Sequence, residues 1–136
     1  MFASIYSEEF VTISANKELK IILVTWKGGC SSKEYRNAME HSLDIAQDFK
    51  FESWISDTTS GVETDTADGE WLAKQFIPKA LEQITKVALV VNESENIILN
   101  QDRSFCPKKV GYFDSLQEAE KWILHEVKVT SVNLVK

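Results

Sequence analysis

The sequence predicts a single α/β domain, in which a mixed five-stranded sheet begins with an antiparallel hairpin, continues in parallel and carries about four helices. Two observations lead to this prediction. Apolar runs of strand length alternate along the chain with segments whose apolar residues recur at helical spacing. One run, Val87 to Val91, is apolar throughout, which is typical of a strand covered on both faces. A length of 136 residues suits one core better than two.

The first two strands are expected to form a hairpin. Residues 2–13 have a strand pattern interrupted by polar residues, and Leu19 to Trp26 form a run rich in β-branched residues. Residues 15–18 (ANKE) suit the turn between them, because asparagine tolerates the left-handed backbone. The chain is therefore predicted to open with an antiparallel pair.

A helix is predicted from Ser31 to about Lys50, followed by a short strand from Phe51 to Ser56. Ser31 and Glu34 have the spacing of a capping box, in which each residue bonds the backbone of the other. The predicted buried face of this helix consists of Tyr35, Ala38, Met39, Ser42, Ile45, Ala46 and Phe49.

The segment after Lys50 is strongly acidic. Residues 51–73 contain no Lys or Arg and six carboxylates, as many as the net charge of −6 on the whole chain. Asp65 and Asp68 are placed to cap a second helix, where acids oppose the macrodipole. Pro78 predicts a kink or break near Phe76 or Ile77, because proline cannot donate the helical hydrogen bond. The inward face expected for this helix is Trp71, Leu72, Gln75, Phe76, Lys79, Ala80 and Gln83.

The last third of the chain is expected to hold a short helix around Ile97 to Leu99, a core strand from Val110 to Phe113, and a helix capped by Asp114 with Gln117. The buried face of that last helix is predicted to be Leu116, Ala119, Trp122 and Ile123. Residues 127–136 alternate apolar and polar side chains, which fits either an added edge strand or a loosely packed tail.

Composition argues against several functions. The negative net charge and the single basic pair, Lys108 and Lys109, disfavour nucleic-acid binding. No apolar run approaches the roughly 18 to 20 residues that span a bilayer, and acids near the N-terminus do not fit a signal peptide, so we expect a cytoplasmic protein. Cys30 and Cys106 lack a CxxC spacing and are interpreted as reduced thiols, with a disulfide or a reactive Cys30 as alternatives.

Motifs of catalysis and metal binding are missing from the sequence. There is no GxSxG, phosphate loop or dinucleotide fingerprint, and His41 and His125 are interpreted as surface residues. Four acids could supply oxygen ligands, but their spacing is not that of an EF-hand: Asp57, Glu63, Asp65 and Asp68. We therefore predict no catalytic residue, no metal site and no cofactor.

A binding site is expected at one edge of the sheet. Ligands of open α/β sheets bind beyond the carboxyl ends of the strands. The residues predicted to meet at this edge are Gly28, Gly29, Cys30, Asp57, Thr58, Asn92 and Glu93. The two glycines are typical of a turn that needs positive φ. Trp71, which follows the acidic loop, is the aromatic residue best placed to line a cleft there.

Six segments share the order and texture of a known family: VTWKG, SSKEYRNAMEHSLDIAQ, WISD, DGEWLAKQFIPKAL, KVALVV and YFDSLQEAEKWI. From about Lys20 to Ile123 the chain resembles the SpoIIAA-like proteins, which have a STAS/SEC14-like fold and are in many cases uncharacterised bacterial proteins. Members of known role are either anti-sigma antagonists, switched by phosphorylation after the middle strand, or lipid-carrying SEC14 domains.

The first of these roles would place a phosphorylated residue at Thr58, Thr59 or Ser60. In this chain the motif reads DTTSGV and is followed by further acids. A phosphate would add about −1.5 to −2 charges to a segment that is already acidic. Hydroxyl groups that hydrogen-bond a turn are the competing interpretation of these three residues.

The functional hypothesis is a noncatalytic bacterial module that acts by association with a protein partner or as a homodimer. One alternative is a carrier of a lipid or small apolar ligand, in which the kink at Pro78 holds a helix away from the sheet. A second alternative is a small enzyme that uses Asp57. No nucleic-acid partner and no membrane span are expected.

Overall fold

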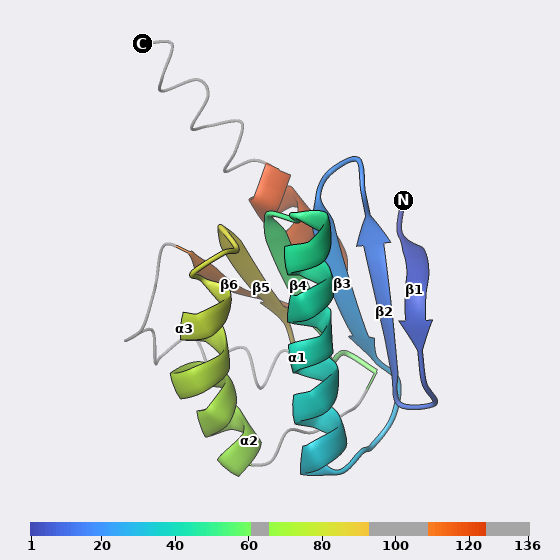
Figure 1. Cartoon of the computed structure of the whole chain (residues 1–136), viewed down its shortest axis with the longest axis vertical. Helices are drawn as coiled ribbons and strands as arrows, with labels where there is room; N and C mark the ends of the chain where they lie inside the picture. The colour runs from blue at the N-terminus through green and yellow to red at the C-terminus, as the bar shows by residue number, and fades with distance from the viewer. Residues whose placement is uncertain (61–65, 93–108, 125–136) are drawn as a thin grey trace.

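The computed structural model describes residues 1–60, 66–92 and 109–124, which form a mixed six-stranded sheet with helices on both faces (Figure 1). The strands lie side by side in chain order: β1 (Ala3–Ser7), β2 (Val11–Asn16), β3 (Ile21–Trp26), β4 (Ser53–Asp57), β5 (Lys86–Val90) and β6 (Val110–Phe113). Strands β1 to β3 pair antiparallel, and strands β3 to β6 pair parallel. The predicted α/β sheet with an antiparallel start and a parallel remainder is confirmed.

The prediction of five strands is wrong by one, because residues 2–13 form two strands. The polar interruption in this segment is a tight turn, in which Glu8 N donates to Val11 O (2.8 Å) and Val11 N donates to Glu8 O (3.4 Å). The turn folds β1 back onto β2, so that β1 becomes the edge of the sheet. The register between β1 and β2 shifts between Ser4 and Tyr6 and passes over Ile5.

The turn between β2 and β3 lies two residues later than predicted. It occupies residues 17–20, and Lys20, not Asn16, has the left-handed backbone, with φ of 58°. Asn16 instead acts through its side chain, whose Oδ1 accepts a hydrogen bond from Leu19 N (3.0 Å). The asparagine therefore closes the turn without adopting positive φ.

Helix α1 (Ser32–Phe49) begins as predicted. The Ser31 and Glu34 capping box is present, with Glu34 N to Ser31 Oγ at 3.1 Å and Ser31 N to Glu34 Oε1 at 2.9 Å. The predicted buried face is correct except at two positions: Leu43, which was not included, is buried, and Phe49 is 49% exposed. Phe49 is the last residue of the helix and stacks on Phe51.

The helix that contains Pro78 is divided into α2 (Thr66–Trp71), a π-helical turn η1 (Leu72–Phe76) and α3 (Ile77–Ala80). In the π turn Ile77 N donates to Leu72 O, five residues back. This turn inserts one extra residue into the helix just before Pro78. The break predicted near the proline therefore takes the form of a π turn.

The predicted inward face of this helix is correct for its apolar residues and wrong for its three polar ones: Trp71, Phe76 and Ala80 are buried, and Leu72 packs against the same core. The extra residue of the π turn rotates the following turns, so that Gln75, Lys79 and Gln83 are exposed. Ile77 and Ile84, which the predicted face does not include, are buried beside Phe76 and Ala80. The spacing of five residues between Trp71 and Phe76 marks the insertion.

A third helical segment, residues 116–124, follows β6. Its first turn is capped by Ser115, whose Oγ accepts from Glu118 N (3.3 Å), one position later than the predicted cap at Asp114. Ala119 and Ile123 are buried as predicted, and Leu116 and Trp122 pack against the same cluster. The predicted helix around Ile97 to Leu99 and the tail 127–136 lie outside the described residues.

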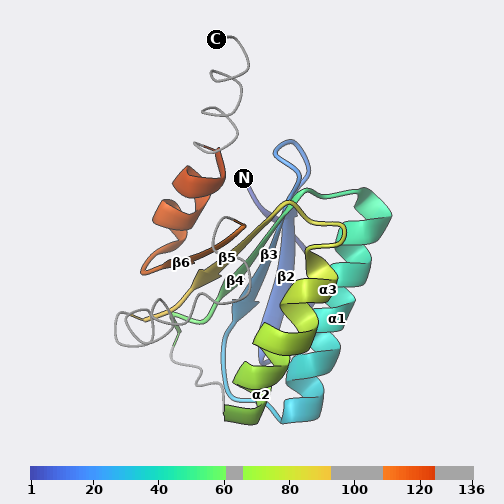
Figure 2. The same cartoon turned by 90° about the vertical axis from the view of Figure 1, so that its left-hand side faces the viewer.

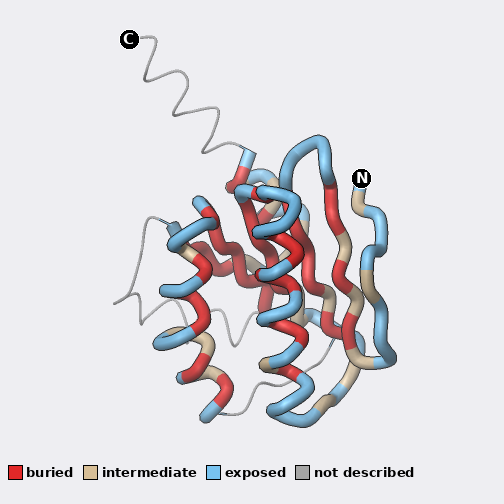
Figure 3. The backbone as a smooth tube through the Cα atoms, in the orientation of Figure 1, coloured by how far each residue is buried: buried red, intermediate tan, exposed pale blue. Residues whose placement is uncertain are grey.

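The helices form a layer on each side of the sheet. Helices α1 and α2–α3 cover one face, and residues 116–124 cover the other (Figure 2). The buried residues concentrate in β2 to β5 and on the inner sides of α1 and α3, whereas β1 is largely exposed (Figure 3). The core therefore thins towards the β1 edge.

Two buried tryptophans connect the elements of the core. Trp26 of β3 donates from Nε1 to Ser56 Oγ of β4 (3.1 Å). Trp54 of β4 donates from Nε1 to Ser42 Oγ of α1 (2.8 Å). Ser42 Oγ donates in turn to Met39 O (2.6 Å), so both indole groups are satisfied without water.

The serine acceptors can be tested by removing one hydroxyl at a time. In Ser42→Ala and Ser56→Ala a fully buried indole N–H loses its acceptor, so each change is expected to lower the free energy of unfolding by about 1 to 3 kcal/mol. Urea denaturation measures this quantity. The matched control is Ser4→Ala on exposed β1, expected to change it by less than about 0.5 kcal/mol. Equal losses in all three variants would contradict the role of the indole hydrogen bonds.

Candidate functional site

The carboxyl ends of the parallel strands meet at one edge of the sheet, as predicted. The register pairs Thr25 with Asp57, Asp57 with Val90, and Val90 with Phe113. Thr58 follows β4 directly, and both its N (2.9 Å) and its Oγ1 (3.1 Å) donate to Val90 O. The structure therefore places Asp57, Thr58 and the exposed Asn92 near the ends of neighbouring strands.

Asp57 has a local structural role at this edge. Its Oδ1 accepts hydrogen bonds from Thr59 N (2.9 Å) and from Thr59 Oγ1 (2.6 Å), which closes a turn after β4. Thr58 Oγ1 is bonded to the backbone of β5, whereas Ser60 is exposed. The interpretation of the threonine hydroxyls as turn-forming groups thus has a direct geometric basis.

The loop after β3 is open and unstrained. Neither Gly28 nor Gly29 has a left-handed backbone, and a Cβ atom at either would meet nothing within 4 Å. The expectation that these glycines serve a turn with positive φ is therefore wrong. Cys30, which follows them, is a half-buried free thiol that packs against the core.

Trp71 lies in the core and does not line a cleft at this edge. It is 9% exposed and packs between Tyr35 of α1 (ring centroids 6.1 Å apart) and Phe76 of η1 (5.5 Å). The guanidinium of Arg36 lies over the indole, with Cζ 5.3 Å from its centroid. The cleft expected beside Trp71 is filled by these side chains.

Asp68 joins the start of α2 to the start of α1. Its buried carboxylate accepts hydrogen bonds from Ser32 Oγ (2.8 Å) and Arg36 Nε (3.0 Å). The predicted helix-capping acid is thus engaged in a tertiary ion pair. Asp65 and Glu63, the other acids considered as capping or metal ligands, lie outside the described residues, as does Glu93.

The environment of Cys30 makes its thiol less acidic. Burial raises the pKa of Cys30 above the ordinary value, and the negative charges of Glu34 and Asp68 raise it further. A raised pKa keeps the thiol protonated at neutral pH, and the thiolate is the nucleophilic form. This is the opposite of what a reactive cysteine requires. Cys106, the possible disulfide partner, lies outside the described residues.

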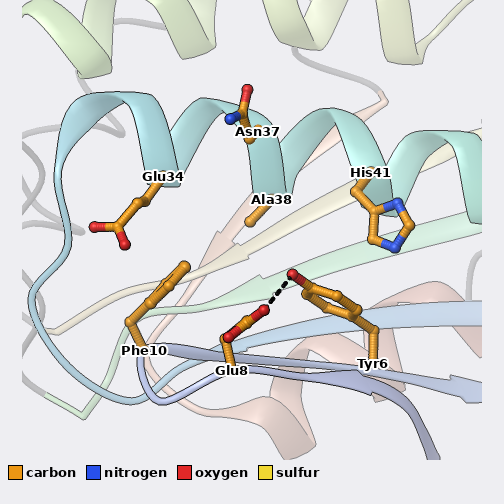
Figure 4. Close-up of a pocket in the computed structure, with 7 residues that line it drawn as sticks. All are labelled: Tyr6, Glu8, Phe10, Glu34, Asn37, Ala38 and His41. Carbon is orange, nitrogen blue, oxygen red and sulfur yellow. Dashed lines mark hydrogen bonds between the residues drawn. The ribbon is translucent and has the colours of Figure 1, made fainter.

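A groove that the sequence did not reveal lies between the β1–β2 turn and α1. It has a volume of about 430 Å³ and is lined by Tyr6, Glu8, Phe10, Glu34, Asn37, Ala38 and His41 (Figure 4). Tyr6 Oη donates to Glu8 Oε1 (2.9 Å), and the Tyr6 and His41 rings meet edge to face with centroids 4.7 Å apart. We call this site the hairpin groove.

One signal in the sequence does relate to the hairpin groove. Glu34, Asn37, Ala38 and His41 have the i, i+3, i+4, i+7 spacing of one helical face. The pattern does not tell which strand faces these residues, because β1 was not distinguished from β2. His41 is exposed as predicted, and His125 lies outside the described residues.

A second hollow of about 280 Å³ lies near the end of α1 and the amino ends of β4 and β5. It is lined by Ala46, Gln47, Lys50, Phe51, Glu52, Gln83 and Ile84. The helix that contains Pro78 does not stand away from the sheet, because Phe76, Ile77 and Ala80 are each at most 1% exposed beneath it. These packed side chains occupy the space that a carrier would need for its ligand.

Two further features concern the part of the chain that the structure describes. There, no group of three or more His, Cys, Asp or Glu side chains is arranged to hold a metal ion. None of the helices in the same ranges is long and apolar enough to cross a membrane.

Comparison with known proteins adds no assignment. No model of a protein family matches the chain, and none of the curated proteins is significantly similar to it.

The raised pKa of Cys30 predicts slow alkylation by iodoacetamide. In the folded protein the midpoint of the rate against pH should lie above 9.0, the ordinary pKa, whereas in urea the same cysteine should titrate near the ordinary value. Peptide mass spectrometry separates its modification from that of Cys106.

The contribution of charge to this pKa can be separated from burial. Glu34→Gln removes a negative charge but keeps a capping residue, so the midpoint for Cys30 should fall towards the ordinary value. Glu40→Gln makes the same charge change at an exposed position farther along α1 and should leave the midpoint unchanged. A folded-state midpoint at or below 9.0 would contradict the electrostatic account of the thiol.

Proposed function

We propose that the chain is a noncatalytic α/β module of SpoIIAA-like type that acts by protein association, and that a strand of the partner adds to the outer edge of β1. The observation that carries this proposal is the exposed edge itself. Among the described strands, β1 pairs only with β2, and four of its five residues are exposed. An open strand edge presents backbone donors and acceptors to another chain.

The sequence of β1 supports this use of the edge. Natural sheets usually protect an open edge with charged residues, proline or bulges. Residues 1–7 contain no Lys, Arg, Asp, Glu or Pro. The register shift at Ile5 is a protective feature within the described residues, but Ile5 is itself 40% exposed. The edge therefore presents an uncharged strand with an apolar residue at its centre.

The alternatives receive less support from the geometry. The Asp57 carboxylate closes a turn with Thr59, which suits a structural role more than an acid, base or nucleophile. A lipid carrier would need room under the Pro78 helix, where Phe76 and Ile77 pack on the sheet. A phosphorylation switch at Ser60 is compatible with its exposure, but the hydroxyls of Thr58 and Thr59 are both engaged.

Site-specific photo-crosslinking in the host cell tests association at β1. A photoreactive phenylalanine analogue placed at Ile5 is expected to give a discrete covalent adduct with a second protein. The matched control carries the analogue at Lys79, an exposed position of α3, the helix drawn on the side away from β1 (Figure 1). An adduct of twice the chain mass identifies a homodimer, and another mass identifies a different partner. If position 5 gives no adduct above position 79, the proposal fails.

A second substitution tests whether the strand edge itself is used. Ala3→Lys places a charge on β1, and lysine on an edge strand opposes the addition of another strand. The adduct at position 5 is expected to fall about fivefold, which corresponds to roughly 1 kcal/mol. Ala67→Lys, at an exposed position of α2, makes the same change away from β1 and should leave the yield unchanged. An equal yield in both variants would contradict strand addition.

A further inference from the structure

We propose that the hairpin groove binds an arginine or lysine side chain of the partner segment that adds to β1, so that the partner is a basic peptide segment of a different protein. This inference rests on the proposed function and adds the chemistry of the partner to it. Three properties of the groove lead to it: its shape, its charge and its position beside β1.

The shape of the groove suits one long side chain. Its volume of about 430 Å³ lies at the small end of the roughly 300 to 1,000 Å³ typical of ligand sites. Phe10 and Tyr6 rise from the hairpin, and Ala38 and His41 project from α1 opposite them (Figure 4). Aromatic rings on the walls attract a cation placed over their faces.

The charge of the groove is negative. Glu8 and Glu34 are the acids among the seven lining residues, and the lining contains no Lys or Arg. Each carboxylate uses one oxygen locally: Glu8 Oε1 accepts from Tyr6 Oη, and Glu34 Oε1 accepts from Ser31 N. Within the described ranges, no hydrogen bond is made by the second oxygen of either carboxylate. Two acceptors therefore remain for a ligand.

These groups favour a cation over the other ligand classes. An anion would be repelled by both carboxylates, and a neutral apolar group would remove water from them without replacing its hydrogen bonds. A guanidinium or ammonium group would make charge-assisted hydrogen bonds to the free oxygens while its stem contacts the rings. Arginine fits better than lysine, because its planar group can stack on a ring and bond a carboxylate at once.

The hydrogen bond between Tyr6 and Glu8 holds part of this arrangement in place. That bond, together with burial and the charge of Glu8, raises the pKa of the Tyr6 hydroxyl above its ordinary value. The hydroxyl therefore stays protonated at physiological pH and continues to donate to Oε1. Glu8 is thereby oriented in the ligand-free protein.

The position of the groove connects it to the strand edge. Tyr6 belongs to β1, and Glu8 and Phe10 belong to the turn that follows it. Side chains of an added strand alternate between the two faces of the sheet. Those on the α1 face of such a strand would lie beside Tyr6, at the mouth of the groove.

The same features disfavour a second copy of this chain as the occupant. Each copy carries a net charge of −6, so two copies repel one another. A second β1 strand would also bring no basic side chain, because residues 1–7 contain neither Lys nor Arg. A basic segment of another protein complements both the net charge and the groove.

The test uses small probes of defined charge on the full chain. N-acetyl-arginine N-methylamide and its neutral citrulline counterpart, which have nearly the same shape, are titrated while backbone amide NMR shifts are recorded. The arginine probe is expected to shift amides of residues 6–10 and 34–41 and to bind at least about tenfold more tightly than the citrulline probe. Equal affinities, or shifts confined to other parts of the chain, would overturn the proposal.

Variants with a single charge removed identify the carboxylates involved. Glu8→Gln keeps an acceptor for Tyr6, and Glu34→Gln keeps the capping box, so both should retain the fold. Each is expected to weaken the arginine probe by about tenfold. Glu9→Gln and Glu40→Gln remove the same charge from exposed positions outside the groove and should weaken it less than twofold. Equal weakening in all four variants would assign the effect to net charge and overturn the groove site.

The outcome separates this inference from the proposed function. A crosslinked partner at position 5 together with no preference for the arginine probe would reject the basic partner segment and leave association at β1 standing. Preference for the arginine probe without any crosslink at position 5 would reject strand addition to β1, and with it the inference that the groove serves that partner. An adduct of twice the chain mass would also overturn the inference, because it identifies a second copy.

Discussion

Two fully buried indole N–H groups each need a hydrogen-bond acceptor, and this requirement links the central strands to one another and to α1. Trp26 reaches Ser56 across the pair β3–β4, and Trp54 reaches Ser42 on α1. A buried N–H without an acceptor costs more than the bond contributes, so both contacts must form in the folded state. The Trp54 contact fixes α1 over β4, and Tyr35 of α1 packs against Trp26 of β3. With α1 held there, its first three turns stand opposite the β1–β2 turn and form one wall of the hairpin groove.

The π turn before Pro78 serves the same core. An uninterrupted α-helix would place Gln75 and Lys79 on the inner face after Trp71. The inserted residue instead brings Phe76 against both Trp71 and Trp54, at centroid distances of 5.5 and 5.2 Å. The proline thus coincides with a register change that improves packing. As a consequence, Trp71 is packed in the core. It does not line a binding site at the carboxyl edge of the sheet, as the sequence had suggested it would.

Sequence reasoning succeeded where the physical signal is local. The capping box at Ser31, the apolar strand at Val87 and the meeting of strand ends at Asp57 depend on spacing or on a general rule of parallel sheets. It failed where one residue changes a register, as in the turn at Glu8 and in the π turn. The hairpin groove was missed for a further reason: Tyr6 and His41 are 35 positions apart, and their contact requires the topology of the sheet. Spacing alone could identify only the α1 side of the groove.

The distribution of charge shows why density in the sequence is a poor guide to a binding site. The acidic segment 51–73 holds the greatest concentration of carboxylates, yet three of its four described acids are already engaged: Asp57 in a turn, Asp68 with Arg36 and Glu52 with Lys20. Glu8 and Glu34 lie outside this segment, Glu8 beside one other acid and Glu34 beside none. In the hairpin groove, each keeps one carboxylate oxygen free near aromatic rings. A carboxylate binds a cationic ligand through the acceptors it has left, and neighbouring aromatic faces add to that attraction. The two glutamates of the hairpin groove are therefore better placed to select a cation than the acidic segment is.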